Sequence, residues 1–261
     1  MSAGTYTPKP GAAPLTRMIA AQAAFETKML LRNGEQLLLT VIIPSLLLVL
    51  FSTVDVVAVP TETSEGAGEA VDFLAPGVLA LAVMSTAFTG QAIATGFERR
   101  YGVLKRLGAS PIPRWALMAA KTLSVLVTEI LQIVLLTVIA FALGWSPHGS
   151  PLSVVLLLVL GTAAFSGLGL LMAGTLRAEA TLAAANLVFL LLLVGGGVIV
   201  PLDRFPDGVA SALGLLPISA LSDGLRDVLQ HGGGMPWGNL GILALWAVLG
   251  LGAAARTFRW E

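Results

Sequence analysis

The sequence lacks cysteine and is poor in charged residues. Without cysteine, disulfides, thiolate metal sites and thiol catalysis are excluded. Charged residues make up 11% of the 261 residues, compared with about 25% in an average soluble domain. The net charge is zero, so the chain as a whole offers no electrostatic attraction to nucleic acid. The two histidines, His148 and His231, lie in Gly/Pro-rich connections, and we expect no metal site.

A phosphate-binding G-x-x-x-x-G-K-[ST] motif is also missing. The sequence therefore contains no phosphate-binding loop of that type, and we predict no catalytic residues. If the protein performs work that needs energy, the energy must come from another polypeptide or from an ion gradient.

Long apolar runs dominate what is present. Hydrophobic residues make up 56% of the chain, and about 20 consecutive apolar residues suffice for one helical crossing of a bilayer. The predicted class is an all-α integral membrane protein with six transmembrane helices per protomer. The predicted spans are residues 37–54, 73–97, 115–143, 152–176, 180–202 and 237–255.

The basic residues predict the orientation. With the N-terminus in the cytoplasm, every Lys and Arg except Arg204 and Arg226 falls on the cytoplasmic side, as the positive-inside rule requires. We therefore predict a multi-pass plasma-membrane protein whose N- and C-termini are both cytoplasmic.

Three further segments lie outside the predicted spans. Residues 1–14 are rich in Pro, Gly, Ala and Thr and predict a disordered tail. Residues 15–36 form an amphipathic interfacial (connecting) helix, which leaves residues 37–261 as the transmembrane domain. Residues 208–222, which contain Pro217, are too short to cross and predict an extracellular re-entrant or interfacial segment before the last span.

The connection between the second and third spans has amphipathic periodicity. Apolar or aromatic residues recur at Phe97, Tyr101, Leu104 and Leu107, interleaved with basic residues. We predict one short helix over 97–107, with Glu98 near its start and Gly108 as a left-handed C-terminal cap. Two interpretations stay open: a basic loop that follows the positive-inside rule, or a docking element for a cytoplasmic partner.

Polar residues inside the spans are few. Glu129 lies mid-span, and Gln132 follows on the same helical face. Polar packing within the bundle, a substrate path and a proton relay are the alternatives for this pair, with Asn186 as another path candidate. Small residues at i, i+4 spacing, such as Ala163 with Gly167, fit either packing within one protomer or a subunit interface.

The 97–115 connection and the segment after the fifth span resemble ABC-2-type permeases, the membrane subunits of ABC exporters such as the daunorubicin-resistance type. The matching residues are Glu98, Arg99, Arg100, Gly102, Leu104, Leu107, Ser110, Pro111, Ile112 and Arg114, followed by Pro206, Pro217, Gly224 and Arg226.

The resemblance implies a six-helix protomer that works as a homodimer or heterodimer with two copies of a separate ATPase subunit, which binds ATP and Mg. The 97–107 segment is then the coupling helix, whose contact residues are Glu98, Arg99, Arg100, Tyr101, Leu104, Lys105 and Leu107.

The implied function is outward transport of a hydrophobic or amphipathic small molecule across a bacterial plasma membrane, as in multidrug efflux or antibiotic resistance. Membrane lipids and the lipophilic substrate are the other expected partners. The alternatives are an exporter of lipid-linked glycan, an ion-coupled secondary transporter, or a membrane scaffold that transports nothing.

Overall fold

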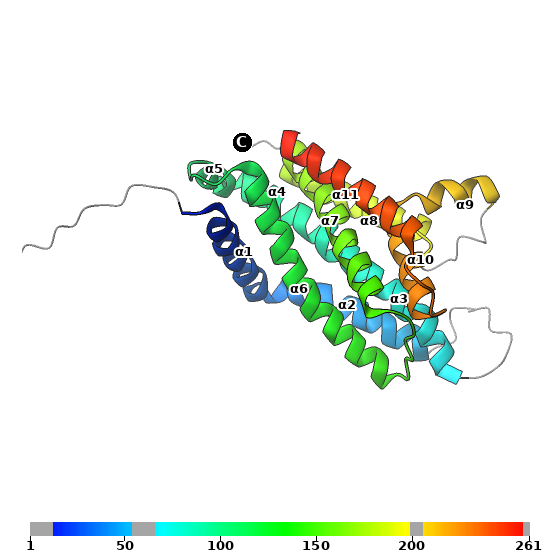
Figure 1. Cartoon of the computed structure of the whole chain (residues 1–261). Coiled ribbons are helices and arrows are strands. Elements are labelled where there is room, and N and C mark those ends of the chain that lie inside the picture. The colour runs from blue at the N-terminus through cyan, green and yellow to red at the C-terminus, as the bar shows by residue number, and fades with distance from the viewer. Residues whose placement is uncertain (1–12, 54–65, 199–205, 258–261) are drawn as a thin grey trace, which may run out of the picture.

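The structure is a computed structural model that describes residues 13–53, 66–198 and 206–257 (Figure 1). Most of the predicted 1–14 tail lies outside the described residues. Within them, every regular element is a helix. The elements are α1 (Leu15–Arg32), α2 (Gly34–Thr53), α3 (Gly66–Val83), the π-helical η1 (Met84–Gly90), α4 (Gln91–Arg100), α5 (Val103–Gly108), α6 (Arg114–Ala142), α7 (Pro151–Thr175), α8 (Ala178–Gly195), α9 (Asp207–Gly214), α10 (Pro217–Leu229) and α11 (Trp237–Thr257).

Five of the predicted spans are confirmed as helices long and apolar enough to cross a membrane. They cover Val71–Arg100, Arg114–Ala142, Pro151–Thr175, Ala178–Gly195 and Trp237–Thr257. The first predicted span corresponds to α2, whose described apolar part is Thr40–Leu50. Part of the fifth predicted span, residues 199–202, lies outside the described residues.

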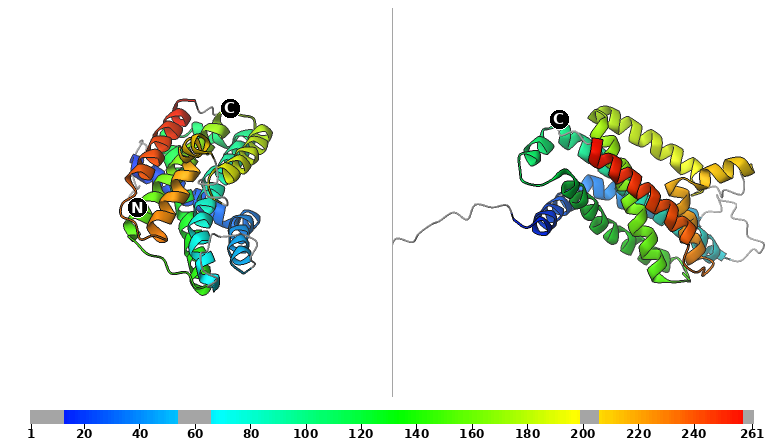
Figure 2. Two further views of the ribbon diagram at one scale, coloured as in Figure 1. Left: turned by 90° about the vertical axis from the view of Figure 1, so that its right-hand side faces the viewer. Right: turned by 45° about the horizontal axis from the view of Figure 1, so that its top comes forward.

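The segment before the last span is bent. Gly208–Gly214 and Pro217–Leu229 meet at 88°, because Pro217 opens α10 and cannot continue the preceding helix. This geometry fits either the predicted re-entrant segment or a single broken span. α9 and α10 lie at one end of the bundle, whereas the start of α1, the helix α5 and the end of α11 lie at the other (Figures 1 and 2).

The closest helix pairing is α7 against α11 (Figure 1). A Cβ placed on Gly167 would lie 2.6 Å from the backbone nitrogen of Leu251 and 2.8 Å from the carbonyl carbon of Gly250. The backbones therefore touch, as small residues permit in membrane helices. At Gly167 the predicted small-residue contact lies within the protomer.

Gly167→Ala should loosen this pairing. Overpacking of a close contact costs typically about 1–3 kcal/mol, and here the obstructing atoms are backbone. Thermal unfolding of the detergent-solubilised protein measures the loss. Gly252→Ala in α11 is the matched control, because a Cβ there meets nothing within 4 Å. If both variants melt alike, the backbone contact contributes nothing to stability.

Candidate functional site

The predicted coupling segment is not one helix, and that prediction is wrong. α4 ends at Arg100, Gly102 has a φ of +73°, and a separate helix α5 starts at Val103. The left-handed residue is Gly102 rather than Gly108, because the chain turns between the two helices instead of after them. Glu98 consequently lies near the end of a long membrane helix and not at a helix start.

The two arginines before this turn contact the α7–α8 junction. Arg99 donates a hydrogen bond to the carbonyl of Leu176, and Arg100 pairs with Glu179 in the first turn of α8. The Arg100–Glu179 pair is more than half exposed on both sides, so it contributes little stability by itself. Together the contacts fix the end of α4 against α8.

Helix α5 is anchored by Leu104, and the partly buried Leu107 packs against the same hydrophobic cluster. Leu104 is fully buried and packs with Leu117, Met118, Leu170 and Ala254 from α6, α7 and α11. Leu104 therefore anchors α5 to the helix bundle.

The remaining coupling candidates differ in accessibility. Tyr101 is 69% exposed and its ring stacks on Phe97 at 6.2 Å between centroids. Lys105 is exposed and Leu107 is half-buried. Among the predicted coupling residues, Arg100, Tyr101 and Lys105 are the exposed ones, and of these Arg100 is held by its ion pair with α8.

A buried charge cluster lies directly beneath this element. The Lys121 ammonium nitrogen on α6 is 3.0 Å from Glu26 Oε1 on α1 and 2.6 Å from Glu98 Oε2 on α4. Gln22 also donates to Glu26 Oε1 at 2.9 Å. The side chains of Lys121 and Glu26 are 5% and 11% exposed. Water therefore screens the attraction between their charges only weakly. We call Glu26, Glu98 and Lys121 the charge cluster.

The charge cluster joins three elements that are distant in sequence. One cation faces two carboxylates, so removing the cation would leave two like charges in a poorly solvated place. Because α1, α4 and α6 meet at Lys121, the charge cluster connects the end of α4, just before the α4–α5 turn, to both other helices.

The two polar residues predicted in the middle of the third span lie on one buried face of α6. Glu129 and Gln132 are each 2% exposed. Thr162 of α7 donates a hydrogen bond to Glu129, whose Oε1 has no partner within the described residues. Gln132 accepts from Thr86 of η1 at 2.9 Å and donates to the backbone carbonyl of Thr40 in α2. The two residues therefore connect α6 to three neighbouring helices.

One turn further along α7, Ser166 donates to Gln91 Oε1 at 2.6 Å. Thr162 and Ser166 thus continue a line of polar contacts between α7, α6 and α4. The π-helical η1 begins just before Thr86, and such segments widen a helix locally and occur often at functional sites.

Asn186 is separate from this line. Its side chain is exposed and its amide donates to the carbonyl of Leu182 in its own helix, at 2.9 Å. The structure does not bring it together with Glu129 or Gln132, and its role as a path residue stays a prediction.

At the opposite end, Arg226 of α10 holds the chain that follows α8. Its guanidinium donates to the carbonyls of Gly197 and Val198, both at 2.7 Å, and lies 4.5 Å from the Phe73 ring centroid. α8 ends at Gly195, so the helix stops before the end of the predicted fifth span, at the Gly195–Gly197 run. Arg226 therefore links the bent segment to α3 and to the end of α8.

The model of the ABC-2 family transporter protein family matches residues 11–256. The chain belongs to the ABC-2 transporter family. No curated protein matches the sequence. ABC-2 permeases are membrane components that work with a separate ATPase subunit.

For an ABC-2 permease, the charge cluster is the feature that sequence reasoning missed. A signal was present, because Glu26 shares a helical face with Ala23, and Lys121 and Glu129 are the two charged residues inside the predicted span 115–143. The pairing itself depends on tertiary structure. Within the described part of this permease, no three His, Asp or Glu side chains are grouped to hold a metal ion.

Proposed function

We propose that the chain is the permease subunit of an ATP-driven exporter and that the α4–α5 turn receives motion from the ATPase. The observation that carries this proposal is that the turn is exposed on one side and packed against the membrane helices on the other. Its outer side exposes Tyr101 and Lys105, while its inner side is fastened by Leu104 and by the charge cluster to α1 and α6. A loop that only obeyed the positive-inside rule would need no such fastening.

The proposed orientation has the α1, α5 and C-terminal end of the bundle in the cytoplasm of a bacterial cell. These elements lie at one end (Figure 1), as an even number of crossings requires. The proposed assembly contains two permease protomers and two ATPase subunits, of the daunorubicin-resistance-like type.

The proposed cargo is a hydrophobic or amphipathic small molecule. A pocket of about 410 Å³ lies between η1, α7, α8 and α11 and is lined almost entirely by apolar side chains, among them Phe88, Met172, Val188 and Trp246. A pocket of this size and lining suits a lipophilic ligand and gives few polar groups to a glycan.

The docking role of the turn is tested with the double variant Tyr101→Ala/Lys105→Ala. We expect its affinity for the ATPase to fall at least about tenfold, because exposed aromatic residues often dominate protein interfaces. Co-purification from native membranes and ATPase stimulation in proteoliposomes are the measurements.

Trp237→Ala is the control, since it removes an aromatic residue that is 74% exposed at the start of α11, near the other end of the bundle. Unchanged ATPase binding by the double variant would exclude this docking surface. Failure of any ATPase to co-purify with the wild-type protein, in several mild detergents, would overturn the exporter proposal as a whole.

A further inference from the structure

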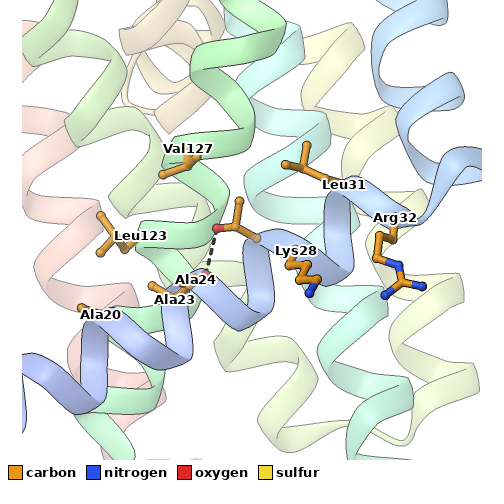
Figure 3. Close-up of a pocket in the computed structure, with 9 residues that line it drawn as sticks. Ala20, Ala23, Ala24, Lys28, Leu31, Arg32, Leu123 and Val127 are labelled. Atoms are coloured by element: carbon orange, nitrogen blue, oxygen red, sulfur yellow. Dashed lines mark hydrogen bonds between the residues drawn. The ribbon is translucent and has the colours of Figure 1, made fainter.

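A groove of about 620 Å³ runs between α1 and α6. It is lined by small residues of α1 such as Ala20 and Ala24, by Leu31, and by Leu123 and Val127 of α6. Figure 3 shows Leu123 and Val127 lying on the α6 side, with Leu31 directed toward the same space. Thr27 also lines the groove, but its hydroxyl donates to the Ala23 carbonyl, so the walls between α1 and α6 are otherwise apolar.

Two cations complete the lining. Lys28 and Arg32 belong to the groove and lie one helical turn apart on α1 (Figure 3). Both are exposed, and within the described residues neither forms an ion pair. The groove thus combines an apolar channel with a doubly positive edge.

The position of the groove relative to a membrane follows from α6. Between Leu123 and Ala142 this helix has 20 residues, which span about 30 Å, the thickness of the hydrocarbon core. The groove includes the first part of this run, Leu123 and Val127, so Lys28 and Arg32 lie near the boundary between hydrocarbon and headgroups.

The same side of α6 continues as an apolar surface. Leu123 and Val127 are 42% and 40% exposed, and Ile130, Val134 and Val138 follow at helical spacing, each more than half exposed. An acyl chain that lies in the groove can therefore pass into the surrounding lipid without crossing a polar wall.

We propose that this groove binds one anionic phospholipid, with an acyl chain between α1 and α6 and the phosphate on Lys28 and Arg32. The charge of the edge favours an anionic headgroup over a zwitterionic one. The lipid would brace α1 against α6 next to the charge cluster. This proposal goes beyond export and does not depend on the ATPase.

Native mass spectrometry of the delipidated full chain tests it. The protein is mixed with equimolar dioleoyl phosphatidylglycerol and dioleoyl phosphatidylcholine. We expect one phosphatidylglycerol to be retained with a preference of roughly 30-fold, the scale expected from two basic groups near a headgroup. Lys28→Gln/Arg32→Gln should abolish the preference.

Arg17→Gln/Arg114→Gln is the matched control, because it removes two exposed charges from α1 and α6 that do not line the groove. It should keep the wild-type preference. Ala24→Phe fills the groove and should lower retention of both lipids, and Ala20→Phe serves the same purpose if the first variant misfolds.

Three results would overturn the proposal. The first is equal loss of preference in the control and in the Lys28/Arg32 variant. The second is unchanged lipid retention in correctly folded groove-filling variants. The third is a groove-filling variant that loses ATPase binding but keeps its lipid, because the occupant would then be the ATPase.

Discussion

Replacing Lys121 by Met should be the most damaging single substitution in the charge cluster. It leaves the carboxylates of Glu26 and Glu98 close together without the cation that both contact. Breaking a buried ion pair by removing one partner costs about 3–5 kcal/mol. For a chain of this length that corresponds to a fall in melting temperature on the order of 10 °C, measured in detergent by fluorescence-detected size exclusion after heating.

Arg114→Met is the control, since it removes a cation from an exposed position at the start of the same helix. The triple variant Glu26→Gln/Glu98→Gln/Lys121→Met should recover most of the stability, because it removes the charges and keeps similar volumes. If the triple variant melts no higher than Lys121→Met, loss of packing rather than unbalanced charge explains the defect.

The charge cluster also shows where sequence reasoning ends. The second, third, fourth and sixth spans could be predicted within a few residues, because an apolar run of sufficient length has one stable place in a bilayer. The fifth was predicted to run to residue 202, whereas α8 ends at Gly195. Glu26 and Lys121 are separated by 95 positions, and nothing local pairs them. Each was visible only as an isolated charge on an apolar face.

The coupling segment was mispredicted for a local reason. Phe97, Tyr101, Leu104 and Leu107 keep helical spacing across Gly102, so their periodicity predicts one helix. Gly102 instead takes the left-handed conformation that its missing side chain permits. The break frees Tyr101 to point outward while Leu104 turns inward.

The mid-span pair was predicted more successfully. The three-residue spacing of Glu129 and Gln132 puts both on one face, and both are buried. Their partners, Thr86, Thr162 and the backbone of Thr40, come from three other helices. Such partners are hydroxyl and carbonyl groups that any span contains, so no sequence pattern distinguishes them.

Arg226→Gln should cause the second large effect, at the other end of the bundle. Arg226 is 7% exposed and its two donors bind two carbonyls that follow the last turn of α8. Hydrogen bonds from a charged group contribute about 1.5–3 kcal/mol each, and the carbonyls would be left without these donors. We expect a loss of about 3 kcal/mol or more, measured by thermal unfolding as above.

Two further variants identify which property of Arg226 matters. Arg226→Lys keeps the charge but cannot donate to both carbonyls while lying flat against Phe73, so its stability should be intermediate. Asp223→Asn removes an ion pair at 3.5 Å to a carboxylate that is 43% exposed, which is worth less than about 1 kcal/mol. If Asp223→Asn destabilises as strongly as Arg226→Gln, the ion pair and not the carbonyl contacts fixes α10 to the end of α8. If Arg226→Lys is as stable as wild type, charge alone is sufficient and the paired donors are not what holds the bent segment in place.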